Sequence, residues 1–515
     1  MATTPQFNIK VGSDSTLSYS REETDAKKAT VGKILDSATN GSDVWEYPIL
    51  SRRTGHSIKG TTESIESSEL RKGRTKSAPR KGNSSSEGDL DFEYSPETYD
   101  DFLEACFRSA WTDWKSDTDS ESNIVEAGET KPECADNQFR TQMGDPLYAD
   151  GTKYPMRYLL GNIGTTAPDG KKYAIEVTDA TQYEVHELCP STKDIKYDML
   201  VQYGGLENED LYQDFEHMAV GSMSLSMTPG EIVTGSFGFM GSNNPDLLNT
   251  DDEAVQLETR FETTKTEDEA KEWLANLPKK GTNTDQSTAN ESDVYVCGEQ
   301  VQYSSDLSFS LDNGLKKIYA IGEKDSISTM PLSLDINGSF TAYLIAGKTE
   351  YLSNLRTQDK NVEMIFTVKD KKEDPEYAYL FQVFETKFSG NDISTGSEEL
   401  TIDMPYDSFG ERACRIFRLR KRRLNKVALA YDESGDVNEI DIQVSSVSDA
   451  FATTDIVVTA TLDGVDVTTD VVGTVEADTE EKCYKCSLTK PSGTGVLAVT
   501  VTYNGSAKTV STVLA

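Results

Sequence analysis

The 515-residue chain lacks a long apolar run, a basic N-terminal segment and a surplus of positive charge. No window approaches the roughly 20 consecutive apolar residues that a membrane-spanning helix needs. The N-terminal segment has neither a basic start nor an apolar centre, so no secretory signal is predicted. We therefore expect the chain to be made in a cytoplasm and kept there until it assembles.

Positive charge is scarce, because 51 Lys and Arg residues stand against 88 Asp and Glu residues, for a formal net charge of −37. Proteins that hold nucleic acid depend on Lys and Arg to replace the counterions around phosphates. The composition therefore argues against a protein that binds DNA or RNA tightly. It remains compatible with a protein that handles DNA by repelling it.

Motifs for catalysis and cofactor binding are also missing. The three histidines, His56, His186 and His217, are far apart in the sequence and lie in no recognisable catalytic or metal-binding setting. No zinc-protease, serine-hydrolase or phosphate-binding loop motif is present. We interpret each histidine as a surface or hydrogen-bonded residue, and we expect neither an enzyme nor a cofactor.

The seven cysteines are odd in number and scattered, which favours reduced thiols over a disulfide framework. Cys483 and Cys486 form one C-x-x-C pair, but zinc needs four ligands and no second pair lies nearby. Residues 117–121 begin like a calcium loop, yet Ser122 and Gly128 stand where a Gly and a bidentate acid belong. No metal site is therefore expected.

The clearest pattern is a period of two on both sides of a Pro-Gly corner, over residues 218–241. Met223, Leu225 and Met227 would point to one face of an extended chain, and small hydroxyl residues to the other. Pro229 and Gly230 suit the second and third positions of a turn, so the stretch predicts a β-hairpin. Its uncharged polar face carries the candidate functional residues Ser222, Ser224, Ser226, Thr234 and Ser236.

Several other segments have interpretable patterns. Ser95 and the following Pro and Glu predict the start of a helix. The apolar residues at helical spacing on its buried face are Tyr99, Phe102, Leu103, Cys106 and Phe107. Asn337-Gly338 inside an alternating run predicts a bulge. The basic run 415–426 predicts an edge strand and linker that pairs with acidic surfaces, and a nucleic-acid patch is the alternative interpretation.

Composition divides the chain into three parts. We interpret residues 1–44 as an N-terminal arm that gains structure only against a partner. Residues 45–423 form the main β-rich domain, with a basic loop at 71–87 and insertions at about 116–195 and 245–293, the second holding a helix near 267–277. Residues 424–515, rich in Val and Thr with Gly turns, predict a small β-sandwich.

The main domain resembles the major tail tube proteins of long-tailed bacteriophages. The order of its motifs carries the resemblance: GTTESIESSELR (60–71), DFEY (91–94), TYDDFLEA (98–105), GSMSLSM (221–227), GEIVTGSFGFMG (230–241), SFSLDNGL (308–315), YAIG (319–322) and GSFTAY (338–343). Both insertions and the C-terminal part depart from the family pattern. The C-terminal part resembles the bacterial immunoglobulin-like domains that decorate many phage tails.

The resemblance implies a mainly β fold of two packed antiparallel sheets flanked by a helix. Six copies would close into a ring with a shared β-barrel, and rings would stack around a tape-measure protein that leaves before DNA passes without specific binding. Tail terminator and distal tail proteins would be further partners, in a virion and at no membrane. The five hydroxyl residues named above would line the bore. The candidate inter-subunit contacts are Thr61, Thr62, Glu63, Ser64, Glu66, Glu69 and Arg71.

Two other functions remain open at this stage. A β-rich surface adhesin predicts an export signal, which the sequence lacks, and monomers or trimers. A tail-associated enzyme that degrades glycans predicts a cleft with paired acids, and with this many acids some will approach one another by chance. A structural protein of the phage tail is the favoured interpretation.

Overall fold

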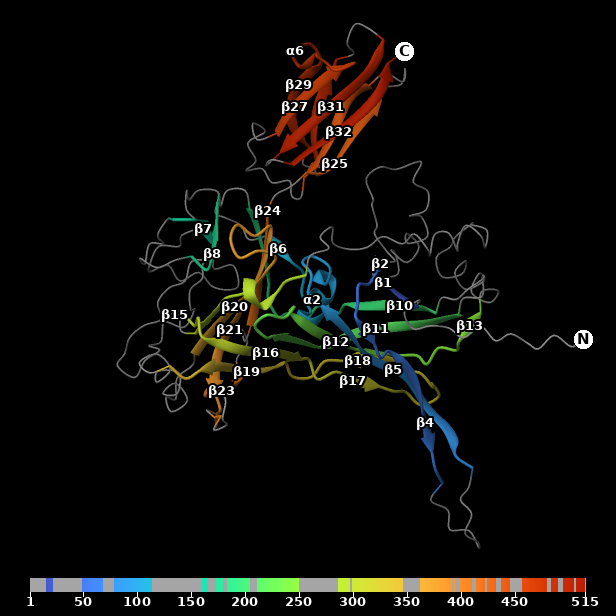
Figure 1. Cartoon of the computed structure of the whole chain (residues 1–515). Helices are drawn as coiled ribbons and strands as arrows, with labels where there is room; N and C mark the ends of the chain where they lie inside the picture. Colours follow the sequence, from blue (N-terminus) through green and yellow to red (C-terminus); the bar gives the residue numbers. More distant parts are fainter. Residues whose placement is uncertain are drawn as a thin grey trace, which may run out of the picture.

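The computed structural model describes a mainly β protein with few helices (Figure 1). The described residues are 15–21, 49–67, 78–113, 160–164, 173–178, 183–203, 211–249, 286–296, 299–345, 362–390, 392–394, 399–409, 414–421, 424–431, 437–444, 456–478, 483–489, 494–503 and 506–514. The expected helix near 267–277 and the calcium-like loop at 117–121 lie outside these ranges. No helix in the described ranges is long and apolar enough to cross a membrane.

The body is built on one antiparallel strand network of 20 strands. One run of neighbouring strands, which we name the first sheet, has the order β4-β5-β12-β11-β16-β19-β23. The bounds of its strands are β4 (Lys59–Ile65), β5 (Arg80–Glu93), β12 (Thr234–Gly241), β11 (Leu211–Met227), β16 (Ser304–Asp312), β19 (Asp335–Tyr343) and β23 (Thr401–Ser408).

A second run, the second sheet, packs on the apolar face of the first. Its strands are β14 (Val294–Val296), β20 (Val362–Lys369), β21 (Tyr377–Phe388), β24 (Cys414–Lys421), β9 (Tyr183–Leu188) and β6 (Thr112–Asp113). Phe309 of the first sheet lies 5.6 Å from Phe366 and 5.7 Å from Phe381 of the second, measured between ring centroids. The prediction of two packed antiparallel sheets is confirmed.

Shorter elements complete the body. Within the network these are β1 (Ser15–Arg21), β2 (Ile49–Leu50), β3 (Gly55–His56), β10 (Lys196–Tyr203), β13 (Leu248–Asn249), β15 (Glu299–Gln300) and β22 (Asp392–Ile393). Two separate pairs are β17 (Lys316–Ile318) with β18 (Ser328–Met330), and β7 (Leu160–Asn162) with β8 (Ile175–Val177); a 3-10 turn, η4, spans Ala289–Glu291. Ile175 and Val177 cover the outer face of the second sheet, so the first insertion contributes to the core.

The predicted hairpin is present as β11 and β12. Ser226 pairs with Thr234 across the turn, and the register continues along both strands to a shift between Val220 and Ser222. The Glu231 N–H donates to the Thr228 carbonyl at 3.1 Å, which closes a four-residue turn. Gly230 has φ of 83°, a value that the third position of a type II turn requires and that glycine adopts without strain.

The helix α2 spans Asp100–Phe107 and buries the predicted stripe, including Phe102 and Cys106. It begins later than expected, because Ser95 does not cap it. The Ser95 hydroxyl instead donates to the Thr98 hydroxyl at 2.9 Å. Phe102 packs against Phe237 of β12 at 5.5 Å between ring centroids, so the helix covers the same apolar face as the second sheet.

The acidic residues in the first turn of the helix, Asp100 and Asp101, are buried and have polar partners. Arg418 donates to the Asp100 carboxylate at 2.5 Å, and its guanidinium lies 4.6 Å from the Trp111 ring centroid. Burial acts to lower the pKa of Arg418, but the Asp100 carboxylate has the opposite effect and the net pKa is raised. The guanidinium therefore stays charged within the core.

The basic run is not an edge strand, which corrects the prediction. β24 pairs with β21 on one side and with β9 on the other, because its partners are brought from distant parts of the chain. Arg415 is 2% exposed and pairs with Glu187, and Arg420 pairs with Glu97. The run does meet acids, as predicted, but the acids that pair with its described residues lie in the same chain.

Three local predictions are wrong. Residues 15–21 form β1 and pair with β10 within the chain, since Leu17 and Tyr19 join its core. Residues 80–87 belong to β5 and pair with β4, so the basic loop is shorter than expected. Residues 337–338 contain no bulge. Gly338 is needed because a Cβ there would lie 2.1 Å from the Ser308 carbonyl oxygen and 2.5 Å from the Tyr406 hydroxyl.

Cysteine usage also differs from expectation at one position. Cys106, Cys414 and Cys486 are free and buried, whereas Cys189 is disulfide-bonded. The expectation of wholly reduced thiols is wrong at this residue, because sequence spacing does not show which cysteines meet in space. Among the described residues no group of three or more His, Cys, Asp or Glu side chains could hold a metal ion.

The C-terminal part forms two four-stranded antiparallel sheets with a core of their own (Figure 1). One has the order β25-β26-β30-β29 and the other β28-β27-β31-β32. The bounds are β25 (Leu424–Tyr431), β26 (Val437–Val444), β27 (Ile456–Leu462), β28 (Val465–Asp466), α6 (Thr468–Val471), β29 (Val472–Asp478), β30 (Cys483–Leu488), β31 (Gly495–Tyr503) and β32 (Ser506–Leu514). Its immunoglobulin-like character stays a prediction.

Candidate functional site

The face of the first sheet that points away from the core is polar across six neighbouring strands, from β5 to β23. The five predicted hydroxyl residues lie together on it. Ser224 pairs with Ser236, their hydroxyl oxygens are 2.9 Å apart, and Ser226 pairs with Thr234. The intervening Met223 and Leu225 are 1% and 3% exposed. The prediction that one face is apolar and buried while the other carries hydroxyls is confirmed.

The hydroxyl rows continue onto strands that sequence reasoning did not assign to the site. Ser308 and Ser310 of β16 pair with Ser226 and Ser224. The Ser339 N–H of β19 donates to the Ser308 hydroxyl at 2.8 Å. The alternation of Ser with Phe and Leu at 308–311 was a usable signal for β16, but the register that aligns these rows depends on distant pairing.

Acidic residues surround the hydroxyl rows on the same face. They are Glu87, Asp89, Asp91 and Glu93 on β5, Asp306 and Asp312 on β16, Asp335 on β19, and Asp403 and Asp407 on β23. At the alternating positions that form this face, within the described residues 87–93, 222–226, 234–240, 306–312, 335–343 and 401–407, there is no Lys, Arg or His. We name this surface the polar face. It offers hydroxyls and carboxylates, and no cation that could bind a phosphate.

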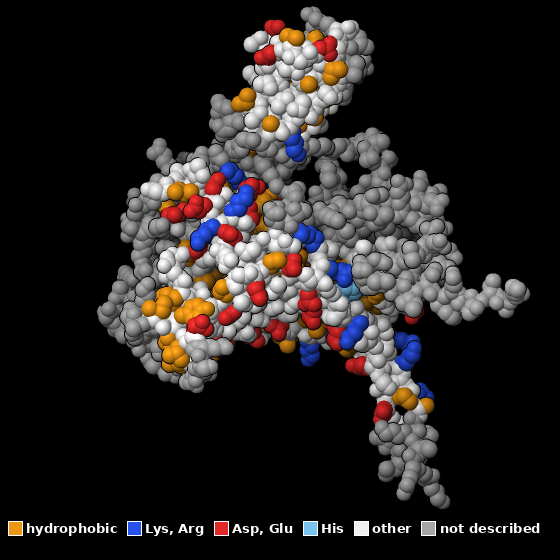
Figure 2. Space-filling view, viewed as in Figure 1, with side chains coloured by type: hydrophobic (Ala, Val, Ile, Leu, Met, Phe, Trp, Pro, Cys, Tyr) orange, Lys and Arg blue, Asp and Glu red, His pale blue; other side chains and the backbone are white. Residues whose placement is uncertain are grey.

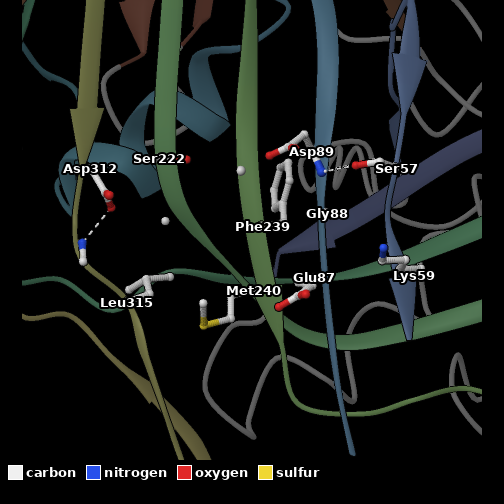
Figure 3. Close-up of a pocket in the computed structure, with 13 residues that line it drawn as sticks. Ser57, Lys59, Glu87, Gly88, Asp89, Ser222, Phe239, Met240, Asp312 and Leu315 are labelled. Atoms are coloured by element: carbon white, nitrogen blue, oxygen red, sulfur yellow. Dashed lines mark hydrogen bonds between the residues drawn. The ribbon is translucent and has the colours of Figure 1, made fainter. Parts of the chain in front are cut away.

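A pocket of about 440 Å³ lies at one end of the polar face (Figure 3). Glu87, Asp89, Ser222 and Asp312 contribute polar side chains to it, beside Met240 and Leu315 and the border residue Lys59. A second lysine, Lys317 of β17, pairs with Glu87 at 3.1 Å between nitrogen and oxygen. The cations nearest to the polar face therefore lie at its border, on β4 and β17.

The candidate inter-subunit residues lie on an edge strand. Thr61, Thr62, Glu63 and Ser64 belong to β4, and Glu66 follows it; Glu69 and Arg71 lie outside the described ranges. β3 and β4 pair with β5 on one side, and no described strand pairs with their other edge. Figure 1 shows β4 and β5 projecting from the body as a long arm. An unpaired edge of this length is a template for another chain.

His56 lies at the base of the arm formed by β4 and β5. Its pKa is lowered to about 4, mainly by burial and to a smaller extent by the positive charge of Arg53. The neutral imidazole is thus favoured in the folded state. The neutral His56 therefore contributes fully to the stability of the fold above about pH 6.5, and this contribution is lost as the pH falls towards 4. We expect the β3–β5 amides to exchange hydrogen faster over this window, after correction for intrinsic rates.

Hydrogen–deuterium exchange with mass spectrometry checks this expectation for residues 54–57 and 88–91. His56→Gln, which cannot titrate, should remove the acceleration, while peptides from the C-terminal sheets serve as an internal control. The same pH profile in both proteins would show that His56 does not control the stability of the arm base.

Comparison with known proteins now adds to this geometry. A search of curated proteins finds no match for the chain. The family model described as phage tail tube protein matches residues 12–408, a span that contains the first sheet, the second sheet except β24, the helix α2 and the polar face. The matched span begins within the predicted N-terminal arm, residues 1–44, and excludes the C-terminal sheets. The chain therefore belongs to the phage tail tube protein family, whose members are structural components of the bacteriophage tail.

Proposed function

We propose that copies of this chain close into hexameric rings, and that stacked rings form a conduit whose bore is lined by the polar face. The single observation that carries the proposal is a broad sheet face that combines hydroxyls and carboxylates and lacks a cation at its alternating positions. DNA repelled by such a wall would not adhere while it slides past. The chain would thus act in genome ejection.

The two edges of the first sheet support the proposed ring closure. The β3–β4 edge ends it on one side, and β22, which pairs only with β23 in the described network, ends it on the other. Joining one edge to the opposite edge of the next copy is a heterologous contact, and such contacts give closed rings when the rotation closes. Closure would protect both edges from uncontrolled pairing. The arm residues Thr61 to Arg71 would contribute to this contact.

The proposal includes other proteins of the phage tail as partners. A tape-measure protein would occupy the bore during assembly, and terminator and distal tail proteins would close the two ends of the tube. The protein would be made in the cytoplasm of the host bacterium and act in the virion. The five hydroxyl residues of the hairpin would face the bore, together with Ser308, Ser310 and Ser339. The C-terminal sheets would decorate the tube.

Negative-stain electron microscopy with native mass spectrometry of the purified full-length chain tests the proposal. We expect rings or tubes with a central hole and a ring mass of six chains. Monomers or trimers without a hole would favour the adhesin alternative. Release of reducing sugars from host glycans would favour the enzyme alternative, and either outcome would overturn the proposed conduit.

A further inference from the structure

The first sheet ends in two edges of opposite charge. At one edge, residues 52–81 contain nine Lys or Arg residues and three Asp or Glu residues, and both β3 and β4 lie within this range. Figure 2 shows Lys and Arg side chains along the described part of the arm that β4 forms with β5. At the other edge, residues 389–409 contain five acids and no Lys or Arg. We name these two ranges the basic edge and the acidic edge.

Two acids of the acidic edge are partners in the sheet. Asp392 of β22 and Asp403 of β23 occupy directly opposite positions, and like charges at such positions destabilise a sheet. The Asp403 carboxylate accepts a hydrogen bond from the Thr341 hydroxyl at 3.1 Å, and among the described residues no Lys or Arg forms an ion pair with it. A cation supplied by another molecule would relieve this repulsion.

The basic edge offers an ammonium group on the same face of the sheet. Lys59 of β4 is directly opposite Glu87 of β5, so its side chain belongs to the polar side of the sheet (Figure 3). The Glu87 carboxylate is already paired with Lys317, at 3.1 Å between nitrogen and oxygen. Lys59 is exposed, and its ammonium group has no ionic partner in the described part of the chain. It is therefore available to a carboxylate of another copy.

The strand directions allow the two edges to meet as an antiparallel pair. From β4 to β22 the first sheet is a run of eight strands, and every neighbouring pair in the run is antiparallel. Because the number of strands is even, β22 of one copy and β4 of the next copy run in opposite directions where the edges meet. The alternation of directions then continues across this contact, which we name the seam.

Lys59 and Asp403 lie at different levels along the strands of one copy. Lys59 is two residues outside the transverse row of paired positions that runs from Asp89 to Asp335. Asp403 pairs with Thr341, which is six residues on the other side of that row. At about 3.3 Å per residue, the two levels are roughly 26 Å apart. A seam that joins the two side chains must therefore be staggered by this amount.

The tilt of strands in a closed barrel supplies such a stagger. Eight strands about 4.8 Å apart span roughly 38 Å, and a tilt of about 35–45° from the barrel axis displaces the next copy along the strands by roughly 27–38 Å. Right-handed strand twist fixes the sense of the tilt. The Ser57 N–H donates to the Asp89 carbonyl at 2.8 Å, which places β5 to the right of an upward β4 when the polar face is viewed. With that face towards the bore, the displacement brings Lys59 of the next copy to the level of Asp403.

We propose that Lys59 of each copy forms an ion pair with Asp403 and Asp392 of the neighbouring copy in the same ring. This inference rests on the proposed function, since it names a contact that closes the ring. The pair relieves the repulsion between the two acids, and like edges repel each other, so the charges select the head-to-tail contact. The cation at the border of the polar face is neutralised at the seam, and the wall of the bore stays negative.

Two single variants of the full-length chain test the ion pair. Lys59→Glu and Asp403→Lys each place like charges on the two sides of the seam, and each should lower the fraction of hexamers by roughly tenfold or more. Native mass spectrometry and sedimentation velocity measure this fraction. Lys193→Glu makes the same charge change at an exposed residue outside the first sheet, so it is the matched control and should form rings normally. Native-like melting curves establish that the variants fold.

Mixing the two variants makes the test directional. Every seam joins opposite charges only when the Lys59→Glu and Asp403→Lys copies alternate, so an equal mixture should form hexamers that contain three copies of each. A mixture that does not recover rings, or hexamers of random composition, would overturn the ion pair. If the unsubstituted protein forms no rings, the proposed function fails; if each variant alone closes rings as well as the unsubstituted protein does, only this inference fails.

Discussion

Replacing Arg418 with Met should lower the free energy of unfolding of the body by about 3–5 kcal/mol, because Asp100 would remain buried without its counter-charge. Asp100 and Arg418 are 5% and 9% exposed, so water cannot solvate the carboxylate left behind. The change also removes the stacking of the guanidinium on Trp111. Urea unfolding followed by near-UV circular dichroism, with the C-terminal sheets as an internal reference, measures the effect.

Two comparisons show whether burial is the cause. Lys371→Ala breaks an exposed pair with Glu376, in which both side chains are more than half exposed, and should cost less than about 1 kcal/mol. Adding Asp100→Asn to Arg418→Met should restore much of the loss, because no uncompensated charge remains. Equal losses for Arg418→Met and Lys371→Ala would contradict this account of the core.

Ejection of DNA should slow by roughly tenfold or more when Ser222, Ser224 and Ser226 are all replaced with Lys, because each new ammonium gives passing phosphates a binding site. The three side chains lie on β11 at the middle of the polar face, two of them opposite the serines of β16. In the proposed ring the three charges per copy would be repeated around the bore. Dye-release or single-particle ejection assays on phage that carry the variant measure the rate.

The control must add the same charge at a different place. Thr459, Thr500 and Thr509 are aligned across β27, β31 and β32 of the C-terminal sheets, and replacing all three with Lys should leave ejection unchanged. Replacing the three β11 serines with Thr tests the effect of bulk alone. Normal ejection through normally assembled tubes of the Ser-to-Lys variant would refute the assignment of the polar face to the bore.

Local periodicity was sufficient to predict the elements that depend on neighbouring residues. The hairpin β11–β12 follows from the alternation of Met223, Leu225 and Met227 with serines, and the turn follows from Pro229-Gly230. The apolar stripe of the helix α2 was predictable for the same reason, because it depends on the spacing of neighbouring residues. Periodicity therefore identifies two of the six strands of the polar face, β11 and β12.

Pairing between distant residues could not be predicted in this way. Arg418 meets Asp100 across 318 positions of sequence, so the charges of 415–426 gave no sign that they would be buried. The register that aligns Ser308 with Ser226 depends equally on contacts far apart in the chain. Gly338 is required because a Cβ there would clash with the Ser308 carbonyl of β16 and the Tyr406 hydroxyl of β23. A single sequence contains these residues but does not show that they touch.

The hydrophobic core of the C-terminal sheets shares no residue with that of the body. β24 ends at Lys421 and β25 begins at Leu424, so only a very short connection joins them. Among the described residues, the two cores therefore offer no shared packing through which a change on the last sheets would disturb the polar face. In the proposed tube, the C-terminal sheets could then diversify, or be exchanged for a foreign module by engineering, while the bore stays the same.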